Sequence, residues 1–314
     1  MGEKEIRGVV AFMTKYCPSD EDGVFDEKSF RNHIRWLLKK RIHVVGFNGG
    51  ADFDYNDAER RRFTQILVEE INGKVPLIVG ASAWDTETAV KRAREVEKMG
   101  ADIVFMTGPP LTRPFGTDPN KIVEHFKRVS DAVNIPISFY NTPGAWPGIM
   151  PPELLRKIEK EAPRVKYMKS GEREMTEYMK MIDGMKGARL KIVAGKSYYN
   201  FHQLHYAWDK PNRPVGMSGY LTAILPAEHV AMWAAFEKND IDKARKVWYF
   251  KILPLAILMY GREFGYNEMT YPNEILKQMG IIKTARIPFT LKGAEDYTKK
   301  EIAKYIELAN PNVK

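Results

Sequence analysis

Residues 76–106 read PLIVGASAWDTETAVKRAREVEKMGADIVFM and contain a complete strand–helix–strand unit. The first and last five residues are rich in β-branched and apolar side chains, which is typical of short buried strands. Between them, Ala89, Ala93 and Val96 recur at helical spacing and predict a helix over 86–99. A strand, a helix and a second strand in this order favour two parallel strands joined by a right-handed crossover.

The same alternation of strand and helix runs through most of the 314 residues. Helical patterns include 28–40 and a helix from about 151, where PPELLRKIEK places proline in the first turn. Eight consecutive strand–helix units close naturally into a (β/α)8 TIM barrel, and an open doubly wound sheet is the alternative. The eight predicted strands are 8–13, 43–47, 76–80, 102–106, 135–140, 165–169, 190–194 and 214–219.

The last part of the chain has a different pattern. No strand is evident beyond about residue 240, and helices are predicted over 240–262, about 270–281 and 295–310. No low-complexity linker separates this part from the rest. We therefore expect residues 1–225 to form the barrel core, and residues 226–314 to add the last barrel helix and a C-terminal helical extension of the same domain.

Charge and composition narrow the class of function. The net charge is +9, but Lys and Arg stand mostly beside Glu and Asp, as in RRRFTQILVEE, which is typical of solvated helix surfaces. No basic stretch is interleaved with aromatic residues, so no nucleic-acid partner is expected, and the basic charge suits an anionic small substrate. No run of 18 apolar residues occurs and the start, MGEKEIRG, is charged. We expect no membrane partner and a cytoplasmic location.

Metal and disulfide chemistry have little support in the sequence. The single cysteine, Cys17, excludes an internal disulfide and a cysteine-built metal cluster. His202 and His205 lie one helical turn apart, but no acidic residue with ligand spacing accompanies them. We predict neither a metal nor a cofactor.

Two lysines stand three residues apart in VKYMKSG, residues 165–171. Side chains alternate along a strand, so Val165, Tyr167 and Lys169 are predicted to share one face. Lys169 ends the strand, where the catalytic groups of a TIM barrel lie, whereas Lys166 lies near the opposite end.

A second reactive group is predicted at the same end of the barrel. Tyr140 ends the preceding strand, in SFYNTPG, one strand–helix unit before Lys169. A desolvated lysine that has lost its proton can attack a carbonyl carbon and form a Schiff base. A nearby phenol can carry protons to and from the carbinolamine and the imine. A solvated or ion-paired lysine and an ordinary strand tyrosine are the alternatives.

FYNTPG, followed by a strand that ends in lysine, resembles the dihydrodipicolinate synthase/N-acetylneuraminate lyase family of class I, Schiff-base aldolases. The likeness covers most of the chain, because VVGFNGGAD resembles the family's glycine-rich loop and VGMSG its eighth strand. The resemblance implies a TIM barrel, a homotetramer, and a lyase that acts on pyruvate or another 2-keto acid.

The resemblance also implies roles for individual residues. Lys169 would form the imine with the keto carbon, and Tyr140 would be the general acid and base. Ser218, in the eighth strand, is a substrate-binding candidate. The glycine-rich loop would hold the substrate carboxylate, because glycines let an anion approach bare amides, although a tight turn would require glycine as well. The loop residues are Phe47, Asn48, Gly49 and Gly50.

The sequence departs from the family's synthases at several of these positions. Phe47 and Leu111 stand where the synthases have a threonine and a tyrosine of a proton relay. Ala145 and Trp146 stand where the synthases have an arginine for a second carboxylate. Phe47, Leu111 and Trp146 are expected to line a more apolar pocket, and core packing is an equal interpretation for Phe47 and Leu111.

We therefore predict a Schiff-base-forming lyase that acts on pyruvate or a 2-keto(-3-deoxy) acid by aldol cleavage, aldol addition or dehydration. Dihydrodipicolinate synthase itself is one alternative, which the missing relay disfavours. A non-catalytic barrel that binds a keto acid or a partner protein is an alternative of another class. Binding alone would not need the pair Lys169 and Tyr140.

Overall fold

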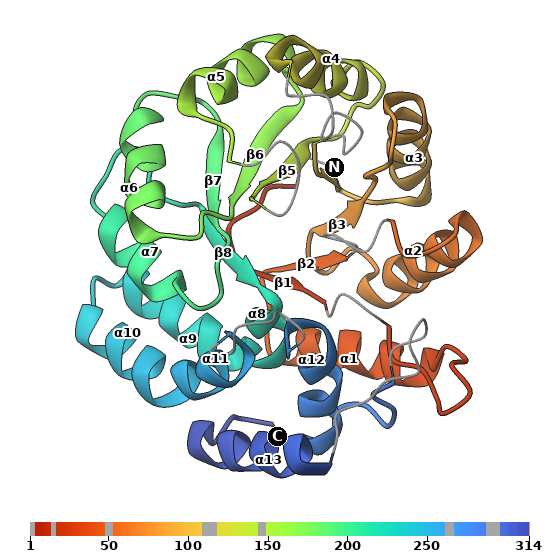
Figure 1. The fold of residues 1–314 in the computed structure, drawn as a ribbon, viewed down its shortest axis with the longest axis vertical. Coiled ribbons are helices and arrows are strands. Elements are labelled where there is room, and N and C mark those ends of the chain that lie inside the picture. The colour runs from red at the N-terminus through yellow and green to blue at the C-terminus, as the bar shows by residue number, and fades with distance from the viewer. Residues whose placement is uncertain are drawn as a thin grey trace.

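Eight parallel strands close into a TIM barrel in the computed structural model, which describes residues 4–13, 17–47, 53–108, 118–143, 149–260, 267–286 and 296–313 (Figure 1). Each strand pairs with the next in sequence, and β8 pairs with β1 to complete the ring. The barrel is the predicted fold, and the open sheet is excluded. The strands are β1 Gly8–Phe12, β2 Val44–Phe47, β3 Leu77–Gly80, β4 Ile103–Met106, β5 Ile137–Asn141, β6 Val165–Ser170, β7 Lys191–Ala194 and β8 Gly216–Gly219.

Helices follow the strands and cover the outside of the barrel (Figure 1). The barrel helices are α1 Glu27–Lys39, α2 Asp57–Ile71, α3 Thr86–Met99, α4 Pro119–Ser130, α5 Pro152–Glu161, α6 Met175–Gly184, α7 Asn200–Ala207, α8 Tyr220–Ile224 and α9 Pro226–Glu237. The helix starts follow from the sequence. For example, the Asn56 side chain accepts from the N–H groups of Ala58 and Glu59, and Glu59 bonds back to the Asn56 N–H in a capping box.

The remaining helices form a group beside the barrel, at the bottom of Figure 1. The predicted helix over 240–262 consists of three elements, α10 Ile241–Val247, a π-helical turn Trp248–Ile252 and α11 Leu253–Tyr260. Two more helices follow, α12 Asn267–Gln278 and α13 Asp296–Ala309. Within the described ranges, no helix is long and apolar enough to cross a bilayer.

The barrel wall separates two cores. The inner core fills the barrel and includes Val10, Phe12, Phe105 and Tyr167. The outer core lies between the strands and the helices, where alternate strand residues such as Met168 pack. Which face a strand residue takes therefore decides whether it can reach a site inside the barrel.

A bulge in β6 changes the predicted alternation of that strand. Ile137 pairs with Val165 but Ser138 pairs with Tyr167, so Lys166 has no opposite residue in β5. Val165 consequently packs in the outer core, and the prediction that it shares a face with Tyr167 was wrong. Beyond the bulge the alternation holds.

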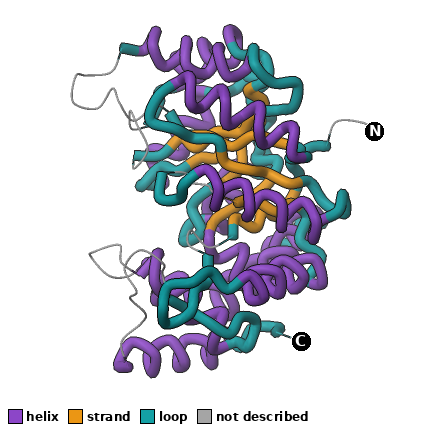
Figure 2. The backbone as a smooth tube through the Cα atoms, turned by 90° about the vertical axis from the view of Figure 1, so that its right-hand side faces the viewer, coloured by secondary structure: helices purple, strands orange, loops and turns teal. Residues whose placement is uncertain are grey.

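The segment before β1 crosses the N-terminal face of the barrel. Ile6 is 2% exposed and packs into the inner core. Its neighbours reach three distant parts of the chain. Lys4 pairs with Asp102 at 3.2 Å, Glu5 with Lys191 at 2.9 Å and Arg7 with Glu237 at 3.0 Å. Figure 2 shows this end of the chain on one side of the strands, with the C-terminal helices beneath the barrel. The segment thus closes the end of the barrel away from the carboxyl ends of the strands.

Candidate active site

Lys169 and Tyr140 lie side by side at the carboxyl ends of β6 and β5. The two residues are register partners in neighbouring strands. The Lys169 Nζ atom is 4.0 Å from the centroid of the Tyr140 ring and 4.8 Å from that of Phe12. Lys169 is only 7% exposed. The structure thus brings together the amine and the phenol that the sequence singled out.

Two phenylalanines of the inner core form an apolar wall around this pair. The Phe12 and Phe105 ring centroids are 4.8 Å apart, and the Phe105 centroid is 6.4 Å from that of Tyr140. Apolar surroundings suit a Schiff-base lysine, because an ammonium group cannot attack a carbonyl. Neither phenylalanine was predicted from the sequence to contribute to the site, although each lies near the end of its strand.

Glycines after β6 and β7 make room for the two side chains. A Cβ at Gly171 would lie 2.6 Å from the Tyr140 ring. A Cβ at Gly195 would lie 2.0 Å from the backbone oxygen of Ser170 and 2.6 Å from Cγ of Lys169. Only glycine allows the strand ends to approach this closely around the amine.

The residues after Tyr140 fix the base of the following loop. The Asn141 side chain accepts from the N–H of Met150 at 2.8 Å and donates to the Met150 carbonyl at 3.4 Å. The Thr142 hydroxyl donates to the carbonyl of Gly171 at 3.4 Å. The asparagine of FYNTPG therefore ties the end of β5 to Met150, which precedes α5, and the threonine ties it to the end of β6.

A buried polar network supports Lys169 from the outside of the barrel. The Ser170 hydroxyl accepts from the Gly195 N–H and from the Gln203 side chain, both at 3.4 Å. The Gln203 side chain in turn accepts from the Lys196 N–H at 3.3 Å and from Asn200 at 3.4 Å. The network ties the end of β6 to the turn after β7 and to α7.

The side chain of Phe47 does not line the barrel. It is 1% exposed and packs in the outer core, where its ring centroid is 5.4 Å from that of Phe30 and 5.7 Å from that of Phe63. The inward position belongs to Gly46, where an added Cβ would meet the Phe12 ring at 2.7 Å. Of the two interpretations open for the Phe47 side chain, core packing is correct and pocket lining was wrong.

Ser218 lies within the barrel wall at the other side of the ring. It pairs with Val10, which lines the inner core, so its side chain faces the barrel interior. The residue is buried, and its hydroxyl has no hydrogen-bond partner among the described residues. The other predicted binding residues lie outside the described residues; they are Asn48, Gly49, Gly50, Leu111 and Trp146.

Metal ligands do not gather within the described part of the chain, where no group of three or more His, Cys, Asp or Glu side chains could hold an ion. Buried His33 and His229 instead contact backbone carbonyls, those of Ala223 at 2.8 Å and Leu225 at 2.7 Å. Burial lowers the pKa of both rings to about 4. They are structural histidines that stay neutral near pH 7.

A TIM barrel with a nearly buried lysine beside a tyrosine at the carboxyl ends of adjacent strands is typical of class I, Schiff-base-forming enzymes. Comparison with known proteins gives the family. The chain belongs to the dihydrodipicolinate synthetase family, whose family model matches residues 5–307. It is accordingly a lyase of the class I aldolase type, and the non-catalytic alternative is not favoured.

Individual relatives agree with this assignment. A 4-hydroxy-tetrahydrodipicolinate synthase from Thermodesulfovibrio yellowstonii is 27% identical over 307 residues, covering 88% of this chain and 98% of the relative. A prophage protein of the dihydrodipicolinic acid synthase family from E. coli K12, solved in complex with pyruvate, superposes with a TM-score of 0.85 at 17% identity. That match covers 98% of this chain and 99% of the other. The structural likeness supports the fold.

Proposed function

We propose that this chain forms a Schiff base between Lys169 and the keto carbon of pyruvate or another 2-keto acid, and that Tyr140 moves the protons. The observation that carries the proposal is the contact between the Lys169 amine and the Tyr140 ring, 4.0 Å from Nζ to the centroid, in a largely buried setting. Binding alone would not require an amine placed beside a phenol at this point.

The chemistry follows from these two groups. The neutral amine adds to the keto carbon to give a carbinolamine, and a proton from the phenol lets the hydroxyl leave as water. The resulting imine is an electron sink for the bonding pair released when a C–C bond breaks or a C–H proton leaves. The enamine that forms is reprotonated, and water then hydrolyses the imine to return the amine.

The substrate carboxylate needs partners at the same mouth of the barrel. We propose that the loop from Phe47 to Gly50 supplies backbone N–H groups, and that the Ser218 hydroxyl points toward the same ligand. Support comes from the position of Phe47 at the carboxyl end of β2 and from the buried, inward-facing hydroxyl of Ser218. A hydroxyl of this kind is stabilised by a ligand oxygen when one binds.

Covalent trapping tests the proposal directly. The protein is incubated with pyruvate and with a panel of 2-keto acids, reduced with borohydride, and mapped by mass spectrometry. We expect one adduct, on Lys169, which Lys169→Ala abolishes. Lys166→Ala is the matched control, because it removes the other lysine of the same strand, and it should leave the adduct intact. A label on Lys166, or none with any acid, would disprove the assignment.

The second candidate is 4-hydroxy-tetrahydrodipicolinate synthase, the activity named for the relatives above. We propose that this chain is poor at that reaction, because Leu111 replaces the relay tyrosine and Ala145 replaces an arginine. The Phe47 side chain packs in the outer core and supplies no relay hydroxyl either. The test is turnover of pyruvate with aspartate semialdehyde. A rate of about 10 s⁻¹, typical of an ordinary enzyme, would show instead that the chain is a synthase.

We also propose that the chain is a homo-oligomer, a tetramer by the family resemblance. Exposed apolar side chains on the C-terminal helices support association, because Phe250 is 69% exposed and Ile257 is 50% exposed. A monomeric dihydrodipicolinate synthase variant is among the similar structures, with a TM-score of 0.85 at 21% identity over 98% of each chain. Light scattering on the purified protein measures its mass in solution and so determines the oligomeric state.

A further inference from the structure

Glu172 is a buried acid that the proposed mechanism does not use. It lies two residues beyond the end of β6 and is 1% exposed. Neither of its carboxyl oxygens has a hydrogen-bond partner in good geometry among the described residues. Buried polar groups almost always have such partners, so an unpartnered carboxyl close behind the imine lysine needs an explanation.

The surroundings of Glu172 bring the pKa of its carboxyl close to neutral pH. Burial is the largest influence and raises the pKa of Glu172 to about 7. The Ser170 hydroxyl and the positive charge of Lys196 lower this pKa, whereas the negative charge of Glu177 raises it. Tyr178 of α6 is also buried, and desolvation and the nearby Glu172 carboxylate raise the pKa of its phenol well above the usual value.

Ser170 directly follows Lys169 in β6 and lies two residues before Glu172. The Ser170 hydroxyl already accepts hydrogen bonds from the Gly195 N–H and from Gln203, so its own proton is left to donate. The same hydroxyl is one of the groups that lower the pKa of Glu172, although neither carboxyl oxygen has a hydrogen-bond partner in good geometry among the described residues. Gly195, bonded to Ser170, lies against the Lys169 side chain so closely that an added Cβ would be 2.6 Å from Cγ.

We propose that Glu172 is a positioning residue for Lys169 and that, through the hydroxyl of Ser170, its carboxylate holds the end of β6 against the turn after β7. The ionised carboxylate accepts the Ser170 proton and leaves the serine oxygen free to accept from Gly195. A protonated carboxyl is itself a donor and competes for that same oxygen. Lys169 therefore has its productive orientation when Glu172 is ionised.

The inference rests on the proposed Schiff-base function and is tested on imine formation itself. The rate of pyruvate trapping at Lys169 is measured by mixing, timed borohydride quenching and mass spectrometry, at pH values from 5.5 to 8.5. Wild type is compared with Glu172→Gln, which keeps the shape of the side chain but cannot ionise. Glu124→Gln, the same change on the exposed face of α4, is the control, and thermal melts show that each variant is folded.

The ratio of wild-type to Glu172→Gln rates is the decisive quantity, because the protonation of the amine itself affects both proteins. We expect a ratio near one at pH 5.5 that rises to about tenfold at pH 8.5, less than the roughly 100-fold that a misplacement of about 1 Å can cost. A ratio that is constant with pH, or that stays near one, would overturn the proposal. If no protein forms the adduct, the proposed function fails instead.

Ser170→Ala separates positioning through Ser170 from a direct effect of the charge. If the serine hydroxyl connects Glu172 to Lys169, Ser170→Ala lowers the rate at pH 8.5, and adding Glu172→Gln causes no further loss. Additive losses in the double variant would contradict the connection through Ser170.

Discussion

At the scale of single residues, the site combines an amine that is nearly buried with aromatic rings on two sides. Lys169 is 7% exposed and its Nζ atom lies 4.0 Å from the Tyr140 ring centroid and 4.8 Å from the Phe12 centroid. Of these two rings, that of Tyr140 carries a hydroxyl group that can donate a proton. Phe12 and Phe105 contribute only apolar surface, which would exclude water from the proposed imine.

Tyr140→Phe separates proton transfer from covalent chemistry. The substitution keeps the ring and its packing, so the protein should fold as wild type. We expect turnover of the best keto-acid substrate to fall about 10²–10⁴-fold, the usual contribution of a general acid or base. The borohydride adduct at Lys169 should still form slowly. Wild-type turnover in Tyr140→Phe would show that the tyrosine is structural and that another group carries the proton.

The raised pKa of Glu172 also makes the stability of the folded protein depend on pH. Its pKa is about 7 in the folded protein and 4.5 as the ordinary value, so the folded state binds this proton more tightly than the unfolded state. The group therefore destabilises the fold progressively as pH rises from about 4.5 to about 7. Above that range the destabilisation is on the order of 3 kcal/mol.

Glu172→Gln should accordingly stabilise the protein, little at pH 5 and most at pH 8. The measurement is the difference in melting temperature between the variant and wild type at the two pH values. The buried histidines have lowered pKa values and therefore destabilise the fold as pH falls. Both proteins contain these histidines, so their effect cancels in the difference in melting temperature. A difference that does not grow with pH would show that the carboxyl is not held in the buried, high-pKa state.

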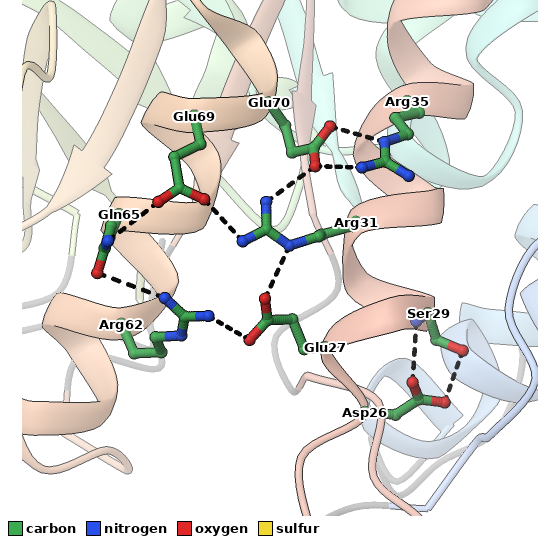
Figure 3. A network of polar contacts seen from close by, with 9 residues as sticks. All are labelled: Asp26, Glu27, Ser29, Arg31, Arg35, Arg62, Gln65, Glu69 and Glu70. Carbon is green, nitrogen blue, oxygen red and sulfur yellow. Dashed lines mark hydrogen bonds and ion pairs between the residues drawn. The ribbon is translucent and has the colours of Figure 1, made fainter.

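At the scale of elements, α1 and α2 are joined by a network of ion pairs centred on Arg31 (Figure 3). Its guanidinium contacts Glu27 at 2.8 Å, Glu69 at 2.7 Å and Glu70 at 2.9 Å. Arg31 is 20% exposed and Glu70 11%, so the centre of the network is partly shielded from solvent. The network fixes two barrel helices that pack on β2 and β3, away from Lys169.

Arg31→Met tests what the network contributes. Three partly exposed ion pairs of about 0.2–1 kcal/mol each suggest a loss of about 1–2 kcal/mol in the free energy of unfolding, smaller at high salt. Urea denaturation at low and high salt measures this. Arg61→Met is the control, because it removes the ion pair between Arg61 and Glu95 at 3.1 Å. This variant should lose less free energy of unfolding than Arg31→Met. Equal losses in the two variants would mean that the network adds nothing beyond single pairs.

At the scale of the whole molecule, the two ends of the barrel have different functions. The carboxyl ends of the strands carry Lys169 and Tyr140, whereas the segment before β1 closes the opposite end with Ile6 and three ion pairs. In TIM barrels the catalytic groups lie at the carboxyl ends of the strands, whereas residues at the opposite face contribute to stability.

Ile6→Ala should therefore destabilise the fold without changing the chemistry. Removing a buried isoleucine side chain costs about 2–5 kcal/mol, whereas Lys4→Ala, which removes one partly exposed ion pair, should cost about 0–1 kcal/mol. Urea denaturation gives both values, and the trapping rate at Lys169 should stay unchanged in each folded variant. A cost for Ile6→Ala as small as that for Lys4→Ala would show that the segment does not seal the barrel.

The sequence by itself determined the barrel and the two residues at its mouth. Strand and helix periods are local, so all eight strands were predicted to within about two residues of their bounds. Parallel neighbours necessarily end at the same side of a sheet. Lys169 and Tyr140, each near the end of its strand, therefore had to meet.

Only the tertiary structure decided which side chains face inward and which polar groups are buried. The bulge at Lys166 moved Val165 to the outer core, and the β2 register placed Gly46 rather than Phe47 inside. Glu172 follows a strand end, where a charged side chain is usually solvated, yet it is buried and neither carboxyl oxygen has a hydrogen-bond partner in good geometry among the described residues. The face of a strand on which a side chain lies, and its burial, depend on contacts between residues far apart in the chain. No local sequence pattern contains that information.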